Sequence, residues 1–228
     1  MGQITSFDKR LQRLKDDSYC GAVTASEHAA LGRRDRKKRQ TRAALAAAAL
    51  RLVAERGLEQ VTVEEISEAA DVSSRTFFNY FPTKDDALIG DQGASRDELL
   101  GAFAAVGPQV SAIEAVRRAM TEAVDEIQAD RELWFLRMRV IAENPVLLSR
   151  LVTGNAEVEQ ALTEAIAIRC GVAPGHGYPA LVAAVTGAAF RTAMLRWAQD
   201  CGARPLPELV DEAFAALAAG LPEPRPAG

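Results

Sequence analysis

Residues 62–81 read TVEEISEAADVSSRTFFNYF, and this stretch decides the fold. Thr62 followed three residues later by Glu65 is a capping box, in which each side chain accepts a hydrogen bond from the other residue's backbone amide and so starts a helix. Residues 70–72 then interrupt the helical period, and Ser73 supplies a second cap, so a second helix must leave at an angle to the first. The pattern predicts a helix-turn-helix whose second helix is built to enter a DNA major groove.

A dense run of positive charge lies just upstream. Residues 33–42 hold seven Lys or Arg side chains against the single Asp35. Such a run neutralises phosphates, although on its own it is as often a solvated face or a flexible tail. Residues 33–84 hold 11 basic and 7 acidic side chains, whereas residues 85–228 hold 12 and 20. One end of the chain therefore attracts a polyanion and the other repels it, which orients an encounter with DNA.

The composition predicts an all-α fold. The chain has 228 residues, of which 48% are hydrophobic and only 6% aromatic, and alanine dominates. No alternating run of apolar and polar residues argues for a strand. We expect about nine helices, covering residues 36–56, two short helices within 62–81, and then 83–106, 111–130, 131–143, 145–170, 178–201 and 206–219.

The same patterns predict four parts. Residues 1–33 are an N-terminal extension largely without order, in which a short helix near residues 6–17 is compatible with the pattern. Residues 34–84 form the helix-turn-helix domain, residues 85–221 a larger helical regulatory and dimerisation domain, and residues 222–228 a disordered, proline-rich tail.

Several classes of site and location are not expected. The three cysteines are too few and too far apart for a zinc site or a disulfide framework, and neither histidine has another ligand at metal-site spacing. We therefore predict no metal and no cofactor. The N-terminus has no apolar run typical of a secretory signal, and the apolar stretch 178–190 is too short to span a bilayer. We expect a cytoplasmic protein with no membrane partner.

At this point residues 38–88 resemble the TetR family of transcriptional regulators. The residues that carry the resemblance are Thr41-Arg42, Gly57, Thr62-Val63, Ile66-Ser67, Ala70, Val72-Ser73, Thr76-Phe77-Phe78, Tyr80-Phe81 and Lys84. The family implies a homodimer whose three-helix heads read the two halves of a palindromic operator. It also implies a C-terminal domain that dimerises and binds a small molecule, which releases the DNA.

Two positions depart from the family pattern. Asp71 stands where the family commonly has glycine, and Asp is able to adopt the left-handed conformation that glycine would supply. Phe78 stands where the family commonly has tyrosine. It has no hydroxyl to donate to a phosphate, although its ring can still pack.

Base reading is expected on the exposed face of the second short helix. Ser74, Arg75 and Asn79 should point toward base edges, because Arg fits guanine and Asn fits adenine in the major groove. Phosphate contacts, by resemblance to the family, are Thr62, Thr76, Tyr80 and Lys84. The full expected DNA-binding set is Lys38, Arg39, Thr41, Arg42, Thr62, Ser73, Ser74, Arg75, Thr76, Asn79, Tyr80 and Lys84. Phe77 and Phe81 are expected in the core of the head.

The C-terminal part suggests a ligand site. Residues 134–147 are similar to the TetR subgroup typified by the mycofactocin regulator, whose members bind acyl-CoA-like ligands. The candidate ligand-binding residues are Phe103, Met120, Trp134, Arg137, Met138 and Ile141, with Arg137 or Arg139 meeting an acidic head group. The alternative is that the large side chains fill a helical core and the arginines pair with surface acids.

A dimer interface is predicted near the C-terminus. Residues 178–201 are apolar on nearly every side and rich in small side chains, which let helices approach closely. Together with residues 206–219 they should form a four-helix interface with their symmetry mates. The candidate interface residues are Ala184, Ala188, Phe190, Leu195 and Phe214.

The leading prediction is a sequence-specific repressor that leaves a palindromic operator when a small hydrophobic or acyl-type effector binds. The effector would shift the helix that starts at Lys84. An architectural DNA-binding protein is one alternative, although it would hardly need a large acidic helical domain. A helical enzyme is another, but the sequence has no Gly-x-Ser-x-Gly, no Gly-x-Gly-x-x-Gly and no clustered histidines, so we predict no enzymatic activity.

Overall fold

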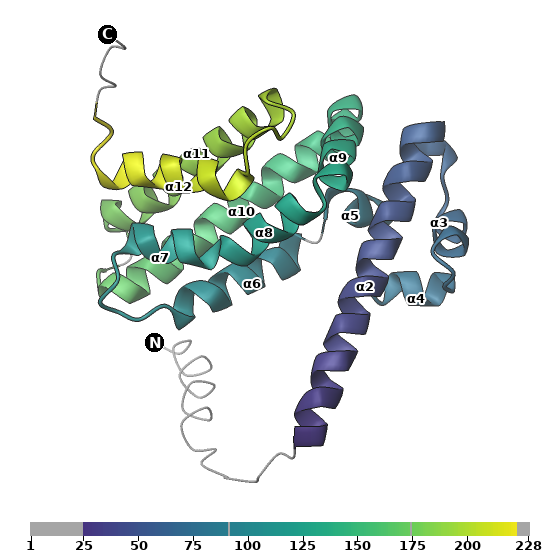
Figure 1. The fold of residues 1–228 in the computed structure, drawn as a ribbon, viewed down its shortest axis with the longest axis horizontal. Helices are drawn as coiled ribbons and strands as arrows, with labels where there is room; N and C mark the ends of the chain where they lie inside the picture. Colours follow the sequence, from purple (N-terminus) through teal and green to yellow (C-terminus); the bar gives the residue numbers. More distant parts are fainter. Residues whose placement is uncertain (1–24, 91, 174, 223–228) are drawn as a thin grey trace, which may run out of the picture. The chain divides into compact units, whose positions relative to one another are not determined.

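The computed structural model describes residues 25–90, 92–173 and 175–222, and within these residues the fold is all-helical, as predicted (Figure 1). The elements are α2 (Ala25–Arg56), the short 3-10 helix η1 (Leu58–Gln60), α3 (Val63–Ala69), α4 (Ser74–Phe78), α5 (Lys84–Ile89), α6 (Gln92–Ala105), α7 (Ala112–Ala119), α8 (Thr121–Ala129), α9 (Arg131–Glu143), α10 (Pro145–Cys170), α11 (Gly177–Gln199) and α12 (Leu206–Ala218). The chain divides into two units, residues 1–41 and 42–228, which are described separately below.

Two of the predicted helices are each divided in two. The helix expected over residues 83–106 ends at Gly90, whose φ of 88° leaves the helical region, so that α5 and α6 are separate. The helix expected over residues 111–130 turns at Met120, whose amide is shared between the carbonyls of Val116 and Arg117. Both breaks depend on a single residue, which a pattern averaged over several helical turns does not detect.

The first unit contributes the N-terminal half of α2. This helix begins at Ala25, within the segment predicted to be an extension, and continues through Gly32. A glycine inside a helix costs only about 1 kcal/mol, and the surrounding alanine, arginine and lysine residues favour the helix. The predicted short helix at residues 6–17 and most of the predicted disordered tail, residues 223–228, lie outside the described residues.

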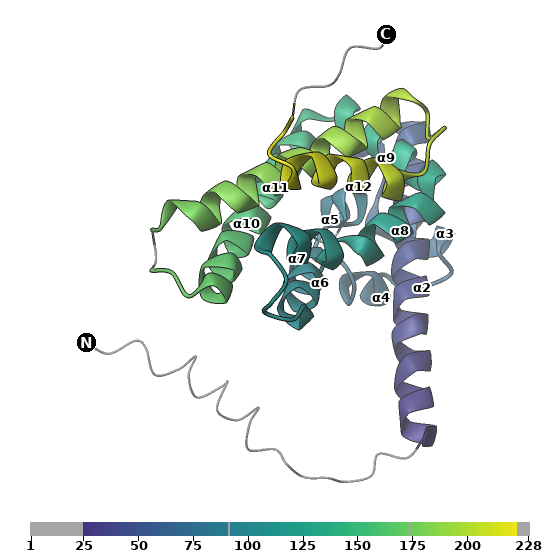
Figure 2. The ribbon, with the colours of Figure 1, turned by 60° about the vertical axis from the view of Figure 1, so that its left-hand side comes forward.

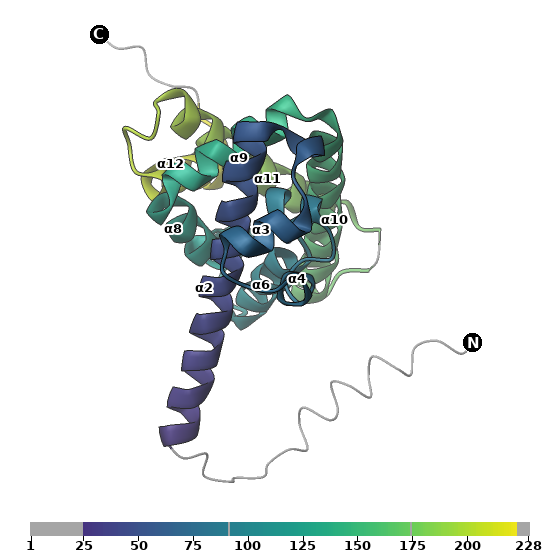
Figure 3. The same cartoon turned by 90° about the vertical axis from the view of Figure 1, so that its right-hand side faces the viewer.

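The head, which we define as residues 42–89, has its own apolar centre. The largest of its fully buried side chains are Leu45, Leu50, Ile66, Phe77, Phe81 and Leu88. Phe77 and Phe81 lie 5.7 Å apart between ring centroids, which confirms the prediction that both are core residues. Figure 3 shows α3 and α4 on the side that faces the viewer, next to the C-terminal part of α2 that belongs to the head.

The core of the head continues into the rest of the chain. Val140 and Ile141 of α9 and Leu147 of α10 are buried in the same cluster as the core residues of the head. The predicted domain boundary after Lys84 therefore falls at the first residue of α5. This helix packs against the head and also against α9 and α10. The head is joined to the remaining helices by a shared apolar core as well as by the chain.

The body, which we define as α6–α12, has a second core. Trp197 of α11 is completely buried, and the ring of Phe135 stacks on it at 5.0 Å with an interplanar angle of 20°. Phe214 and Leu209 of α12 are buried in the same cluster. Figures 1 and 2 both show α12 lying along α11, and Figure 2 also shows α10 and α11 running beside each other.

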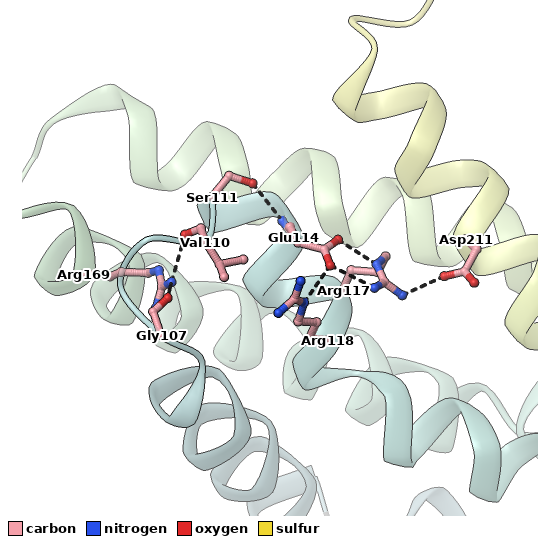
Figure 4. A network of polar contacts seen from close by, with 8 residues as sticks. All are labelled: Gly107, Val110, Ser111, Glu114, Arg117, Arg118, Arg169 and Asp211. Carbon is pink, nitrogen blue, oxygen red and sulfur yellow. Dashed lines mark hydrogen bonds and ion pairs between the residues drawn. The ribbon is translucent and has the colours of Figure 1, made fainter.

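An ion-pair network holds α7 to α12 (Figure 4). The Glu114 carboxylate accepts hydrogen bonds from Nε of Arg117 and from Nε of Arg118, each at 2.7 Å, and Arg117 also bonds Asp211 at 2.8 Å. The hydrogen bonds from Arg117 and then Arg118 lower the pKa of Glu114 to about 2. Glu114 therefore stays charged throughout the physiological pH range and keeps the two arginines in place.

Arg169 closes the loop between α6 and α7. Its guanidinium donates to the carbonyls of Val106, Gly107 and Val110, as Figure 4 shows for the last two, and lies 5.3 Å from the centroid of the Phe103 ring. These carbonyls lie in the loop between the two helices, and the carbonyl of Gly107 also accepts a hydrogen bond from the amide of Val110 at 3.2 Å, so Arg169 adds to the bonds that hold the loop in place. Arg169 of α10 thus fixes the loop that joins α6 to α7.

Candidate nucleic-acid interface

The first helix of the motif starts as predicted. The Thr62 hydroxyl accepts a hydrogen bond from the Glu65 amide at 3.2 Å, and the Glu65 carboxylate accepts one from the Thr62 amide at 2.9 Å. The bond from the Thr62 backbone is the first cause of a lowered pKa of Glu65, and Arg56 also lowers it through an ion pair of 2.9 Å. The predicted capping box is confirmed, and both of its side chains are already engaged within the head.

The turn between the two helices also follows the sequence. Asp71 has φ 54°, which confirms that it adopts the left-handed conformation in place of the family's glycine. The Ser73 hydroxyl accepts a hydrogen bond from the Thr76 amide at 3.2 Å and so caps α4. After Phe78 the amide of Asn79 bonds the carbonyl of Thr76 at 3.1 Å, and the amides of Tyr80 and Phe81 both bond the carbonyl of Phe77 at 2.9 Å. The result is a short, capped rod that is anchored by its buried phenylalanines.

The opposite face of this rod is open. Arg75 and Asn79 are exposed and Ser74 is partly exposed. Among the described residues, none forms a hydrogen bond or ion pair with the side chain of Arg75. The guanidinium fork and the carboxamide are thus available to an external partner. The first offers two donors, which suit guanine, and the second a donor and an acceptor, which suit adenine.

Phe78 is a further exposed residue of α4 that is not in the predicted DNA-binding set. Its side chain is 55% exposed and meets the buried Phe77 ring edge-on at 5.5 Å between centroids. Phe78 lies three residues after Arg75, and residues at this spacing share one face of a helix. The spacing therefore predicts that Phe78 lies on the same exposed face as Arg75. An apolar ring here is suited to contact with thymine methyl groups.

Several of the predicted DNA-binding side chains also form contacts within the protein. The hydroxyls of Ser73 and Thr76 lie 2.9 Å apart in a mutual hydrogen bond, and Tyr80 is half-buried in contact with the head core. Nζ of Lys84 donates to the carbonyls of Leu58 and Val61 at 2.6 and 2.7 Å. An ammonium group carries three hydrogens, so one remains available to a phosphate.

The basic segment is not a uniform arm. Arg42 lies against the core of the head, with its guanidinium carbon 5.1 Å from the centroid of the Phe81 ring, and its role in DNA binding stays a prediction. Burial lowers the pKa of Arg42, and the charge of Glu98 counteracts this. In the separate first unit, Lys38 and Arg39 are exposed, and the hydroxyl of Thr41 donates to the carbonyl of Lys37 at 3.0 Å.

The candidate ligand-binding residues belong to two different cores. Phe103, Met120 and Trp134 pack in the core of the body, whereas Met138 and Ile141 pack in the core shared with the head. In the part of the chain that the structure describes, a hollow of about 560 Å³ is lined instead by Ala102, Arg118, Ala119, Thr121, Glu122, Asp125, Glu126 and Ala129. The six residues are not brought together around one hollow, and their role stays a prediction.

Arg137 has the most unusual environment of the six. Burial lowers its pKa, against a smaller opposite effect of the charge of Asp130, and its buried Nε has no hydrogen-bond partner among the described residues. Its Nη1 lies 4.0 Å from the position that a Cβ on Gly90 would occupy. The positively charged side chain of Arg137 therefore lies close to Gly90, where α5 ends.

The predicted interface helix α11 carries an exposed apolar face. Leu195 is 64% exposed and Ala188 is exposed, while Ala184 and Phe190 are partly buried. Phe214 differs from the expectation, because α12 turns it into the core of the body, where it is 2% exposed. By length and composition α11 would also be able to cross a membrane, with a mean hydropathy of 1.2 in its most apolar window, of which only 28% is buried.

Comparison with known proteins agrees with this geometry. Residues 45–89 match the family model described as bacterial regulatory proteins, tetR family, and residues 110–222 match the model of the MftR C-terminal domain. The chain is 30% identical over 173 residues to the HTH-type transcriptional regulator TcmR of Streptomyces glaucescens, which covers 73% of this chain and 76% of TcmR. The chain belongs to the TetR family.

Two further relatives of this TetR-family regulator are informative. It is 28% identical over 175 residues to the putative mycofactocin biosynthesis transcriptional regulator MftR of Mycobacterium tuberculosis, across 76% of this chain and 87% of MftR. Its fold is similar to that of SmeT from Stenotrophomonas maltophilia, solved in complex with triclosan, with a TM-score of 0.55, 19% identity, and coverage of 82% of this chain and all of the SmeT chain.

The family establishes the general role. This TetR-family protein is a DNA-binding transcriptional regulator with an N-terminal helix-turn-helix and a helical ligand-binding domain. TetR-family regulators are not enzymes, so the alternative of a helical enzyme is set aside on the basis of family membership.

Proposed function

We propose that this regulator acts in the cytoplasm as a homodimeric repressor of a palindromic operator and is released from it by a small hydrophobic, acyl-type effector. The observation that carries the proposal is the capped α4 rod, which is anchored by Phe77 and presents Arg75 and Asn79 to solvent. A face with a bidentate donor and a carboxamide is suited to reading bases, whereas a non-specific architectural protein needs only cations.

Selection of DNA fragments by the purified full-length protein tests this proposal. We expect enrichment of an inverted repeat whose half-sites are related by the two-fold axis of a dimer. Titration with competitor DNA then separates the alternatives, because a sequence reader keeps its operator in the presence of excess unrelated DNA and an architectural protein does not. Recovery of fragments without a shared motif would contradict the proposal.

The proposed homodimer rests on the exposed face of α11. Leu181, Ala188 and Leu195 recur every seven residues, which places them on one side of the helix, and both leucines are more than 60% exposed. We expect the double substitution Leu181→Glu/Leu195→Glu to convert a dimer into a monomer at micromolar concentration and to weaken operator binding strongly, because the two heads would no longer bind as a unit.

Sedimentation or light scattering measures this result. Ile168→Glu is the matched control, since this residue of α10 is 77% exposed and apolar but does not lie on the proposed face. A double variant that stays dimeric, or a control variant that dissociates equally, would show that α11 does not form the interface.

The proposed effector rests on Arg137. SmeT was solved with the hydrophobic molecule triclosan, and residues 110–222 match the MftR C-terminal domain, which supports a ligand site in this domain. Arg137 is partly buried and its Nε is buried without a partner among the described residues, so its guanidinium gains from a carboxylate that supplies this missing hydrogen bond. We expect dodecanoate to raise the melting temperature of the wild-type protein more than dodecanol does, and Arg137→Gln to remove the difference.

Arg139→Gln provides the control, because Arg139 lies on the same helix but is exposed. Thermal unfolding with a series of straight-chain acids and the matching alcohols measures the effect of the acid group at each chain length. Equal responses to acids and alcohols, or an undiminished response of Arg137→Gln, would exclude the assignment of Arg137 to the head group.

A further inference from the structure

The contact between α10 of the body and α5 of the head combines apolar and ionic parts. Leu147 is fully buried and Leu151 partly buried in the core that both share, and Arg150 lies between them in the sequence. Apolar burial holds two helices together but has no preferred direction. Arg150 adds a directional polar contact to this apolar packing.

Arg150 contacts two successive carboxylates at the start of α5. Its Nη1 lies 2.9 Å from Oδ2 of Asp85, and its Nη2 lies 2.7 Å from Oδ1 of Asp86. The other oxygen of Asp86 accepts hydrogen bonds from the amide of Thr83 at 3.0 Å and from its hydroxyl at 2.7 Å. Because the guanidinium is planar and contacts two carboxylates at once, it restricts the rotation of α5 relative to α10 as well as the distance between the two helices.

The first turn of α5 is also tied to the rest of the head. Lys84 binds the carbonyls of Leu58 and Val61, which directly precede α3. Thr83 follows Phe81 by two residues, and the amide of Phe81 closes the last turn after α4. A change in the position of α5 therefore reaches the beginning of α3 and the end of α4 within a few residues.

A break in the helix separates the head from the body. Gly90, with φ 88°, ends α5, and α6 begins at Gln92. We propose that Arg150 is a positioning residue, which fixes the orientation of the head on the body and thereby the spacing of the two operator half-sites that the dimer accepts. The inference rests on the proposed function, since a spacing exists only for a palindromic operator.

The test compares wild type and Arg150→Met on the selected operator and on versions with one or two base pairs added to or removed from the spacer. Each base pair rotates one half-site by roughly 34° relative to the other. We expect the wild type to lose about 30-fold or more in affinity for a change of one base pair, and Arg150→Met to lose less than about 5-fold. Affinity for the best spacing should fall only slightly, because α4 is unchanged.

Three further variants separate positioning from loss of stability. Arg204→Met removes a comparable ion pair with Glu212 within the body and should keep the wild-type spacing preference. Arg150→Lys retains the charge but cannot reach both carboxylates as a planar fork, so it should give an intermediate preference. Asp85→Asn removes one of the two pairs and provides a readout even if Arg150→Met folds poorly.

The outcomes are distinct. A general loss of stability would lower the affinity for every spacer equally, and such a result would overturn the proposal. A selected palindrome with the same spacing preference in wild type and Arg150→Met would also overturn it, while leaving the proposed function intact. Selection of no palindrome would overturn both.

Discussion

Arg75→Ala relaxes the sequence preference of the regulator, and we expect this to be the largest change in specificity from one substitution in the head. Arg75 is exposed on α4, and none of the described residues competes for its guanidinium. A bidentate contact to guanine contributes about 1–3 kcal/mol of discrimination. Affinity for the selected operator should therefore fall roughly 5- to 150-fold, whereas affinity for unrelated DNA should change little.

Equilibrium binding to the operator and to scrambled DNA, at the same salt concentration, measures this difference. Arg51→Ala is the matched control, because Arg51 is an exposed arginine of the head that lies on α2. It removes the same charge from the surface and should affect both DNAs equally. If Arg75→Ala also weakened both DNAs by the same factor, Arg75 would be a phosphate contact and the base-reading assignment would fail.

Local signals account for the parts of the fold that the sequence predicted well. The capping box of Thr62 and Glu65 and the cap of Ser73 each depend on residues no more than three positions apart. The left-handed Asp71 depends on its own backbone preference and on the turn around it. Such features are read directly from a few neighbouring letters, and all three were found where they were expected.

Features that depend on distant contacts were not predicted. Arg150 contacts Asp85 across 65 positions of the chain, and no spacing rule connects them. Arg42 belonged to a basic run in the sequence, but it contacts Phe81 in the fold. Phe214 looked like a surface anchor of the interface, yet packing of α12 buries it. The periodicity of a sequence shows which faces of a helix are apolar. Which of these faces is buried depends on how the helices pack together.

Lys84 has two roles to test, a contact with DNA and a stabilising contact within the head. The resemblance to the TetR family implies a phosphate contact, while the structure gives two short hydrogen bonds from its ammonium group to the carbonyls of Leu58 and Val61. Hydrogen bonds to a charged group contribute about 1.5–3 kcal/mol each. Because Lys84 is only partly buried, the loss should be smaller than the sum of two such bonds, and we expect Lys84→Met to destabilise the head by about 2–4 kcal/mol.

The remaining hydrogen of Lys84 leads to a second expected result. At a temperature where Lys84→Met is still folded by circular dichroism, the slope of log affinity against log salt should be smaller in magnitude by about 0.9, the value for one phosphate contact. Lys38→Met is the contrasting variant, since Lys38 is exposed on α2 and should change the slope without changing the melting temperature. An unchanged melting temperature of Lys84→Met would contradict the internal role, and an unchanged slope would contradict the phosphate contact, so the two roles are tested separately on the same protein.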